Sequence, residues 1–206
     1  MGQAPSKQLV LLAEPASPRA EAFRVLRARL EQTGASQGPR LLLVTSPTDR
    51  EARHVLAANL ALAFAESGTA TTLVDADLHR PGLHELFAVP EAPGLLQFLT
   101  GEAEWESCLQ AAPVPSLFLV AAGGSHPVPA QLWGGRSLDS LQAVLKGGER
   151  LSILISPPAL PAADASLLAP KVDGVVLLST SYGTSRSALR EAKSRLEGVQ
   201  APILGA

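Results

Sequence analysis

Apolar residues fall along the chain in short, nearly continuous runs that are separated by longer amphipathic segments. Five runs have the length of a β-strand, at residues 41–45, 71–77, 117–122, 151–156 and 174–180. Continuous rather than alternating apolar character predicts strands that are covered on both faces. Helical patterns lie between them, at residues 52–66, 130–146, 162–169 and 185–197. This alternation predicts an α/β fold: a mostly parallel sheet with helices on both faces.

Two segments lie outside this alternation. A further amphipathic helix is predicted at residues 18–32, ahead of the first strand, and residues 202–205 predict one more short strand. We therefore divide the chain into an N-terminal segment, residues 1–38, and a domain, residues 39–206. With 206 residues and 46% hydrophobic content, the chain can bury a sizeable core.

Composition excludes several classes of protein. Charged residues make up 17% of the chain and the formal net charge is −2, which does not suggest the basic face of a nucleic-acid-binding protein. The apolar runs are too short for a membrane span. A single cysteine rules out an internal disulfide. We expect a cytoplasmic protein.

Ligands of open α/β sheets bind beyond the carboxyl ends of the strands. Four segments occupy those positions, namely "SPTDREARH", "DADLHRP", "AAGGSHPVP" and "SPPALPAAD". The first follows a strand and opens a helix, as a phosphate-binding loop does, yet it contains neither glycine nor lysine.

These segments, in this order, resemble the bacterial tyrosine kinases, the P-loop ATPases associated with capsule and exopolysaccharide synthesis. The helix "EAFRVLR" carries the family's E-x-x-R-x-x-R motif at Glu21, Arg24 and Arg27. "LVDADLHRP" is similar to the second phosphate motif, and "AAGGSHPVPAQLW" resembles a loop in which the family has Pro-Asn-Pro. "KVDGVVLLSTSYGTSRSALREA" looks like the closing strand and helix. The resemblance implies a three-layer P-loop NTPase-like fold with an N-terminal helix outside the core.

The phosphate loop departs from the family pattern. Where the family reads Pro-Gly-Glu-Gly-Lys-Ser/Thr, the chain reads Asp49, Arg50, Glu51, Ala52, Arg53 and His54. Glycines let successive backbone N–H groups curl around phosphates, and Arg50 and Ala52 replace both. Arg53 keeps the lysine's charge on a longer, planar group, and His54 replaces the hydroxyl that would hold Mg²⁺. We predict a degenerate loop.

The third motif has changed as well. Ile155 stands where the family carries the aspartate that would hold a magnesium-bound water. The family's tyrosine-rich tail has no counterpart, and the only tyrosine is Tyr182. We therefore expect no bound metal or cofactor.

Two carboxylates of the family's site remain, at Asp75 and Asp77. The resemblance implies that the first is a metal-site carboxylate and the second a base that activates the tyrosine hydroxyl. Spacing i, i+2 on a strand would place both on one face. The alternative is that they serve as turn and capping residues ahead of "LHRP". We favour the alternative because no phosphate cradle lies beside them.

Glu21, Arg24 and Arg27 form a slanted stripe along one face of the predicted N-terminal helix. In the family this stripe contacts a neighbouring subunit. The alternative is an exposed face whose ion pairs within the helix contribute a few tenths of a kcal/mol. We favour an interface, with a second copy of the chain or with an intact paralogue.

Our leading hypothesis is a non-catalytic relative of these kinases that regulates polysaccharide polymerisation and export through protein–protein interaction. A membrane chain-length regulator, or polysaccharide co-polymerase, would be its partner at the inner face of the membrane. One alternative is an active, atypical ATPase or tyrosine kinase that uses Mg-ATP with Arg53, Asp75 and Asp77. A second alternative is a MinD- or ParA-like positioning protein.

Overall fold

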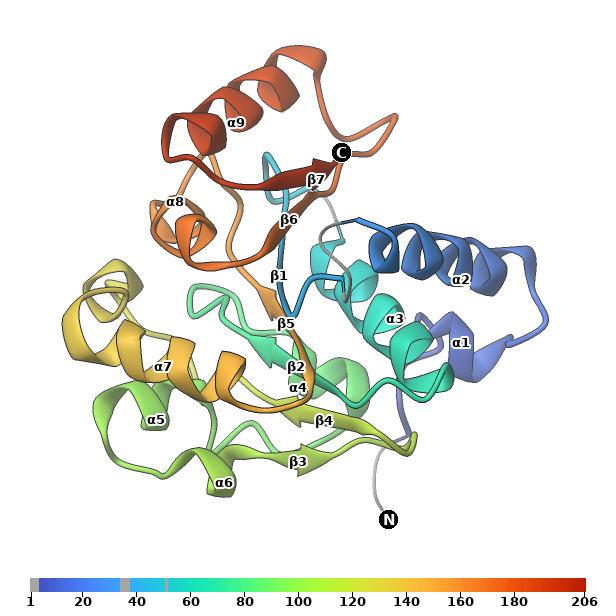
Figure 1. Cartoon of the computed structure of the whole chain (residues 1–206), viewed down its shortest axis with the longest axis horizontal. Helices are drawn as coiled ribbons and strands as arrows, with labels where there is room; N and C mark the ends of the chain where they lie inside the picture. The colour runs from blue at the N-terminus through green and yellow to red at the C-terminus, as the bar shows by residue number, and fades with distance from the viewer. Residues whose placement is uncertain (1–3, 34–37, 51) are drawn as a thin grey trace.

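The computed structural model describes residues 4–33, 38–50 and 52–206, and its centre is a seven-stranded sheet (Figure 1). The strands are β1 (Leu41–Thr45), β2 (Thr71–Asp75), β3 (Gln110–Ala111), β4 (Leu117–Val120), β5 (Leu151–Ile155), β6 (Gly174–Leu177) and β7 (Ile203–Gly205). Their order in the sheet is β3-β4-β2-β5-β1-β6-β7. All neighbours are parallel except β3 and β4. The predicted fold class is confirmed.

Helices cover both faces of the sheet (Figure 1). On one face, the side chains of the sheet form an apolar cluster with those of α1 (Val10–Ala13), α2 (Pro18–Glu31), α3 (Arg53–Glu66) and α4 (Leu83–Phe87). On the opposite face, a second apolar cluster contains side chains of the sheet together with those of α5 (Leu95–Thr100), α6 (Trp105–Cys108), α7 (Gly135–Gly147), α8 (Asp164–Leu168) and α9 (Arg186–Gly198).

The strand β1 shows why its sequence is apolar throughout. Leu42 and Val44 belong to the first cluster, whereas Leu41 and Leu43 belong to the second. Successive side chains of a strand point to opposite faces, so a strand between two helix layers needs apolar residues at every position.

Helix α2 packs on α3 rather than directly on the sheet, as the arrangement in Figure 1 shows. Ser17 caps its first turn by accepting a hydrogen bond from the N–H group of Ala20 at 3.2 Å. Ala20 and Leu30 are buried in the first cluster, so the helix shares the apolar core of α3. The division of the chain after residue 38 stays a prediction.

The structure differs from the sequence-based expectation in the shorter elements. The helix predicted at residues 130–146 is a 3-10 turn, η1 (Pro129–Leu132), followed by α7. The region between β2 and β4 contains α4, α5, α6 and β3, which do not appear among the strands and longer helices predicted above. Within the described ranges no helix is both long and apolar enough to cross a membrane.

Candidate functional site

The strands β1, β5 and β2 end at the same edge of the sheet because they are parallel neighbours. Ile155 at the end of β5 lies in register with Val44 on one side and with Asp75 on the other. The turn after β1, the turn after β2 and the proline-rich segment after β5 therefore meet at this edge. We call the side chains of the first two turns, together with Ile155, the degenerate loop site, after the loop that the sequence predicts to be degenerate.

Arg53, the first residue of α3, turns its side chain into this edge. The side chain is only 5% exposed. Its Nε–H group donates to the main-chain oxygen of Ser156 at 3.0 Å, and Nη2 donates to the carboxylate of Asp77. Oδ1 of Asp49 lies 3.5 Å from the same Nη2 atom. The cation that stands in place of the family's lysine is therefore paired within the chain.

Asp77 is fully buried. Its Oδ2 accepts from Arg53, and its Oδ1 accepts from the N–H groups of His79 and Arg80, at 3.2 and 3.0 Å. An aspartate that accepts from the main chain two and three residues ahead is typical of a turn. Since β2 ends at Asp75, the strand predicted through residue 77 was two residues too long. Asp77 belongs to the turn.

Asp75 is fully buried as well and is surrounded by donors. Nε2 of His54 lies 3.1 Å from its Oδ1. Oδ2 accepts from the N–H groups of Gly82 and Leu83, at 2.9 and 3.0 Å. Oδ1 also accepts from the N–H group of Asp77 at 3.1 Å. This carboxylate thus ties the start of α3 to the turn after β2 and to the start of α4.

Burial has the largest single effect on the pKa of Asp75, and it acts upward. The hydrogen bonds from His54, Gly82 and Leu83 together outweigh burial and hold the pKa of this carboxyl below its usual range. The group is therefore ionised at neutral pH. An ionised carboxylate only accepts hydrogen bonds, so Nε2 of His54 carries the proton of the bond that joins them.

The turn after β1 has no positive φ angle among its described residues, residues 46–50 and 52. Ala52 has φ −83° and ψ 60°, and neither it nor Arg50 adopts a positive φ. No side chain caps the start of α3. Asp49 and Arg50 are exposed, and Asp49 pairs with Arg80 at 3.2 Å. Glu51 lies outside the described residues.

Ile155 gives β5 an apolar last residue. It is fully buried and belongs to the apolar cluster beneath α3. Its position places an aliphatic side chain between β1 and β2, where a carboxylate would face Asp75.

Two hollows lie beside the degenerate loop site. The hollow lined by Asp49, Asp77, Arg80 and Pro157 has a volume of about 150 Å³, whereas small-molecule sites usually measure about 300–1,000 Å³. A larger recess of about 580 Å³ lies between the N-terminal segment, the start of α3 and α4, and Ala52, Arg53 and His54 form part of its wall. No set of three or more His, Cys, Asp or Glu side chains is arranged for a metal ion within the described ranges. The smaller hollow is below the size of a usual small-molecule site, and the larger one is bordered by Arg53 and His54, whose side chains already pair with Asp77 and Asp75.

Asp164 is the last residue of the segment "SPPALPAAD", which was predicted to lie at this edge, but the sequence did not single it out as a residue that connects three segments. Its side chain is 1% exposed. It accepts from the indole N–H group of Trp133 at 2.6 Å and lies 3.2 Å from Nε2 of His79. It thereby joins α8 to the segment before α7 and to the turn after β2. A buried carboxylate needs such partners, but their identity depends on tertiary contacts that spacing does not reveal.

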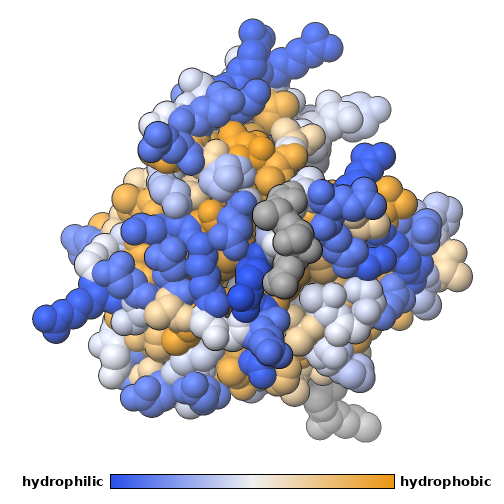
Figure 2. Space-filling model, viewed as in Figure 1, coloured by the Kyte–Doolittle hydropathy of each residue, from blue (hydrophilic) through white to orange (hydrophobic). Residues whose placement is uncertain are grey.

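The stripe on α2 is engaged within the chain. Arg24 makes a two-pronged ion pair with Glu66 of α3, with Nε and Nη2 at 2.7 and 2.8 Å from the carboxylate. Its Nη1 lies 3.3 Å from Glu21, and Arg27 pairs with Glu31 at 3.0 Å. The bond from Arg24 is the main cause that lowers the pKa of Glu66. Hydrophilic side chains predominate over α2, at the right in Figure 2.

Two comparisons with known proteins identify homologues of the chain. YwqD, a tyrosine-protein kinase of Bacillus subtilis, is 29% identical over 205 residues, which cover 100% of the chain and 86% of YwqD. The kinase domain of the Escherichia coli tyrosine kinase ETK superposes with a TM-score of 0.89 at 25% identity, over 96% of the chain and 78% of that domain. The chain is a homologue of the bacterial tyrosine kinases.

Other relatives of this tyrosine-kinase homologue are longer or more distant. The succinoglycan biosynthesis transport protein ExoP of Rhizobium meliloti is 27% identical over 183 residues. These cover 87% of the homologue but only 23% of ExoP. The cell division ATPase MinD of Pyrococcus furiosus has a TM-score of 0.68 at 21% identity, over 80% of the homologue and 69% of MinD, and this likeness shows a shared fold. No protein-family model matches the homologue.

Proposed function

We propose that this tyrosine-kinase homologue is non-catalytic and that it regulates exopolysaccharide or capsule polymerisation and export through protein–protein interaction. The observation that carries the proposal is the pairing of Arg53 with Asp77 and of His54 with Asp75. Arg53, in the place of the phosphate-binding lysine, neutralises Asp77, and His54, in the place of the magnesium-binding hydroxyl, is hydrogen-bonded to Asp75. The polar groups that would contact a nucleotide and its magnesium ion are therefore already bonded to one another.

The energetics of this pairing oppose nucleotide binding. A phosphate that drew Arg53 away would leave Asp77 buried without its cation, which typically costs about 3–5 kcal/mol. A dissociation constant of 1 mM corresponds to only about 4 kcal/mol. A magnesium ion at Asp75 would have to displace His54 in the same way. Nucleotide contacts would thus be offset by the contacts that they replace.

The proposed pathway rests on the family resemblance and on ExoP, whose name refers to succinoglycan biosynthesis and transport. The homologue would act at the inner face of the membrane, where a polysaccharide co-polymerase would recruit it. It binds neither nucleic acid nor Mg-ATP in this proposal.

The alternative of an active, atypical kinase draws on one feature. Arg53 retains a positive charge, and it lies with Asp75 and Asp77 at the edge where the family's chemistry takes place. The alternative of a MinD- or ParA-like positioning protein has the fold alone in its favour.

Phosphoryl transfer distinguishes the proposal from the kinase alternative. The purified homologue, incubated with γ-labelled ATP and Mg²⁺, is expected to incorporate no phosphate at Tyr182, because neither nucleotide nor metal is held. YwqD treated in parallel serves as the positive control. Labelling of Tyr182 that disappears when Mg²⁺ is chelated would support the kinase alternative.

We further propose that α2 forms the interface with a second copy or an intact paralogue, through the stripe of Glu21, Arg24 and Arg27. Arg24 also holds α2 on α3, so its reversal would disturb the fold as well as the surface. The charge swap Arg27→Glu with Glu31→Arg is therefore the better test. It keeps the ion pair within the helix but exchanges the positions of the positive and negative charges on the surface that a partner would contact.

The swap variant is expected to have a lower mass than the wild-type oligomer in multi-angle light scattering, with the melting temperature nearly unchanged. The wild type is compared with the variant at the same concentration. A wild type that is monomeric, or a swap variant with the wild-type mass, would argue against this interface.

A further inference from the structure

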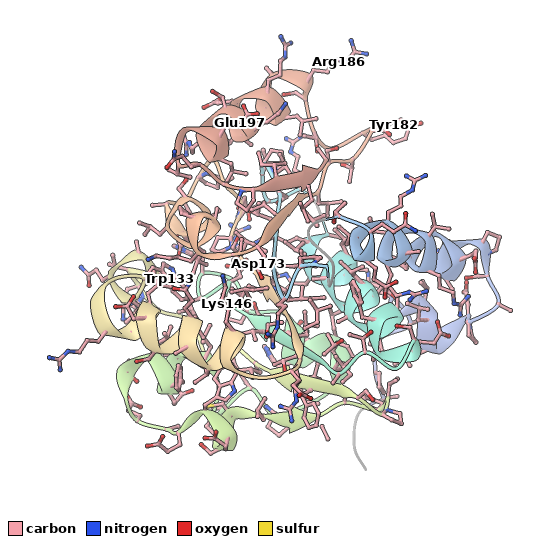
Figure 3. The ribbon with its side chains drawn as sticks, in the orientation of Figure 1. Trp133, Lys146, Asp173, Tyr182, Arg186 and Glu197 are labelled. Atoms are coloured by element: carbon pink, nitrogen blue, oxygen red, sulfur yellow. The ribbon has the colours of Figure 1, made fainter. Side chains whose placement is uncertain are left out.

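Tyr182 is the most exposed large hydrophobic side chain of the described residues. Its relative accessibility is 104%, and Figure 3 shows it projecting from the loop between β6 and α9. An aromatic ring usually contributes a large buried area, and this ring contributes none to the fold. Packing against the described residues therefore does not explain its position.

The loop that carries Tyr182 is closed by its own hydrogen bonds. The N–H group of Thr180 donates to Oγ1 of Thr184 at 2.9 Å, and the N–H group of Gly183 donates to Oγ1 of Thr180 at 3.1 Å. A main-chain bond from Thr184 to Thr180 spans the same residues at 3.1 Å. These contacts hold the tyrosine at the tip of a short turn, between the small residues Ser181 and Gly183.

Two arginines flank this turn. A side-chain Cβ at Gly183 would lie 3.5 Å from Cβ of Arg50, so the stem of Arg50 lies beside the turn. Arg186 follows in the first turn of α9 and projects from the same end of the molecule (Figure 3). Both are exposed, and neither forms an ion pair within residues 4–33, 38–50 and 52–206.

We infer that Tyr182 is a phosphorylation site for a separate tyrosine kinase, and that Arg50 and Arg186 hold the phosphate. In the transfer, the Tyr182 oxygen forms a bond to the γ-phosphorus of a nucleoside triphosphate bound to that kinase. The bond from this phosphorus to the β–γ bridging oxygen breaks, the nucleoside diphosphate leaves, and the phenol proton passes to a base of the kinase.

Charge explains why the phosphate would be held after transfer. Phosphotyrosine carries a charge of about −1.5 to −2 at pH 7 and offers three acceptor oxygens. Arginine pairs with phosphate through two parallel N–H donors, and the start of a helix favours negative charge. A phosphate on Tyr182 would therefore link the β6–α9 loop to the turn after β1 and fix one surface of the degenerate loop site for a partner.

The first test is mass spectrometry of the full-length protein purified from the cells that make it, with phosphatases inhibited. A phosphopeptide that contains Tyr182 is expected from the wild type and not from Tyr182→Phe expressed at the same level. Its absence from the wild type would overturn the inference. Labelling of Tyr182 by the purified homologue alone would instead contradict the proposed function and the role of a separate kinase. Tyr182 would still be a phosphorylation site.

The second test measures the phosphate's surroundings. Phosphotyrosine is placed at position 182 by genetic code expansion, and its second ionisation is followed by phosphorus NMR. The pKa of that group, ordinarily about 6, is expected to fall by about one unit, a tenfold change in proton affinity. Arg50→Gln with Arg186→Gln should restore the ordinary value, and Lys193→Gln, farther along α9, should not. An ordinary pKa without those substitutions would overturn the role of the arginines.

Discussion

Replacement of Arg53 by alanine is expected to lower the free energy of unfolding by about 3–5 kcal/mol, because it leaves the buried carboxylate of Asp77 without a cation. It also removes the donor to the main-chain oxygen of Ser156. In an intact phosphate loop the corresponding side chain faces the ligand, and its loss would affect binding more than folding. Guanidinium denaturation monitored by circular dichroism measures the difference.

Two matched variants isolate the cause. Arg50→Ala removes an exposed arginine of the same turn and is expected to change the free energy of unfolding by no more than about 0.5 kcal/mol. Arg53→Met with Asp77→Asn removes both charges and keeps an acceptor for His79 and Arg80, so most of the loss should be recovered. If Arg53→Ala costs less than about 1 kcal/mol, the ion pair does not have the structural role assigned to it.

Restoration of the family's side chains is expected to create a magnesium-dependent ATP site. The variant carries Arg50→Gly, Ala52→Gly, Arg53→Lys, His54→Ser and Ile155→Asp. Two glycines permit the loop to curl, the lysine and hydroxyl supply the phosphate and magnesium contacts, and the new aspartate faces the metal. Calorimetry should show binding at least tenfold tighter than that of the unmodified chain, which corresponds to about 1.4 kcal/mol.

A four-residue variant that retains Ile155 is the matched control. It avoids a new buried carboxylate beside Asp75 and is expected to bind ATP with a weaker dependence on magnesium than the five-residue variant, because only the serine hydroxyl is added for the metal. If the five-residue variant folds, as judged by circular dichroism, and still does not bind, then these substitutions are not what dismantled the site. If it does not fold without ligand, addition of Mg-ATP is expected to induce a folded state, seen as a cooperative thermal transition that is absent without Mg-ATP.

The regular part of the fold could be predicted from the sequence because its signals are local. The run "LLLVT" predicts a doubly covered strand, and β1 alternates Leu42 toward one helix layer and Leu43 toward the other. The helices α4, α5 and α6 have four to six residues each. They are too short for helical periodicity to emerge, and tertiary packing rather than local pattern determines them.

The site could be predicted only in part. The sequence indicates which groups a phosphate loop has lost, because that follows from residue type. It does not indicate that Arg53 and His54 turn inward and bond to carboxylates more than twenty positions away. The same holds for the ion pair between Arg24 and Glu66, which neither reading of the α2 stripe anticipated. Such pairs depend on how α3 lies against its neighbours, which spacing along the chain does not encode.

Titration of the unmodified chain with ATP in a calorimeter, with and without magnesium, tests the central claim most directly. The claim is that the charges of the degenerate loop site are satisfied within the chain. It predicts no magnesium-dependent heat at millimolar nucleotide, and any weak attraction of ATP to exposed arginines should be abolished by salt. Magnesium-dependent binding of ATP with a dissociation constant well below 1 mM would contradict the claim.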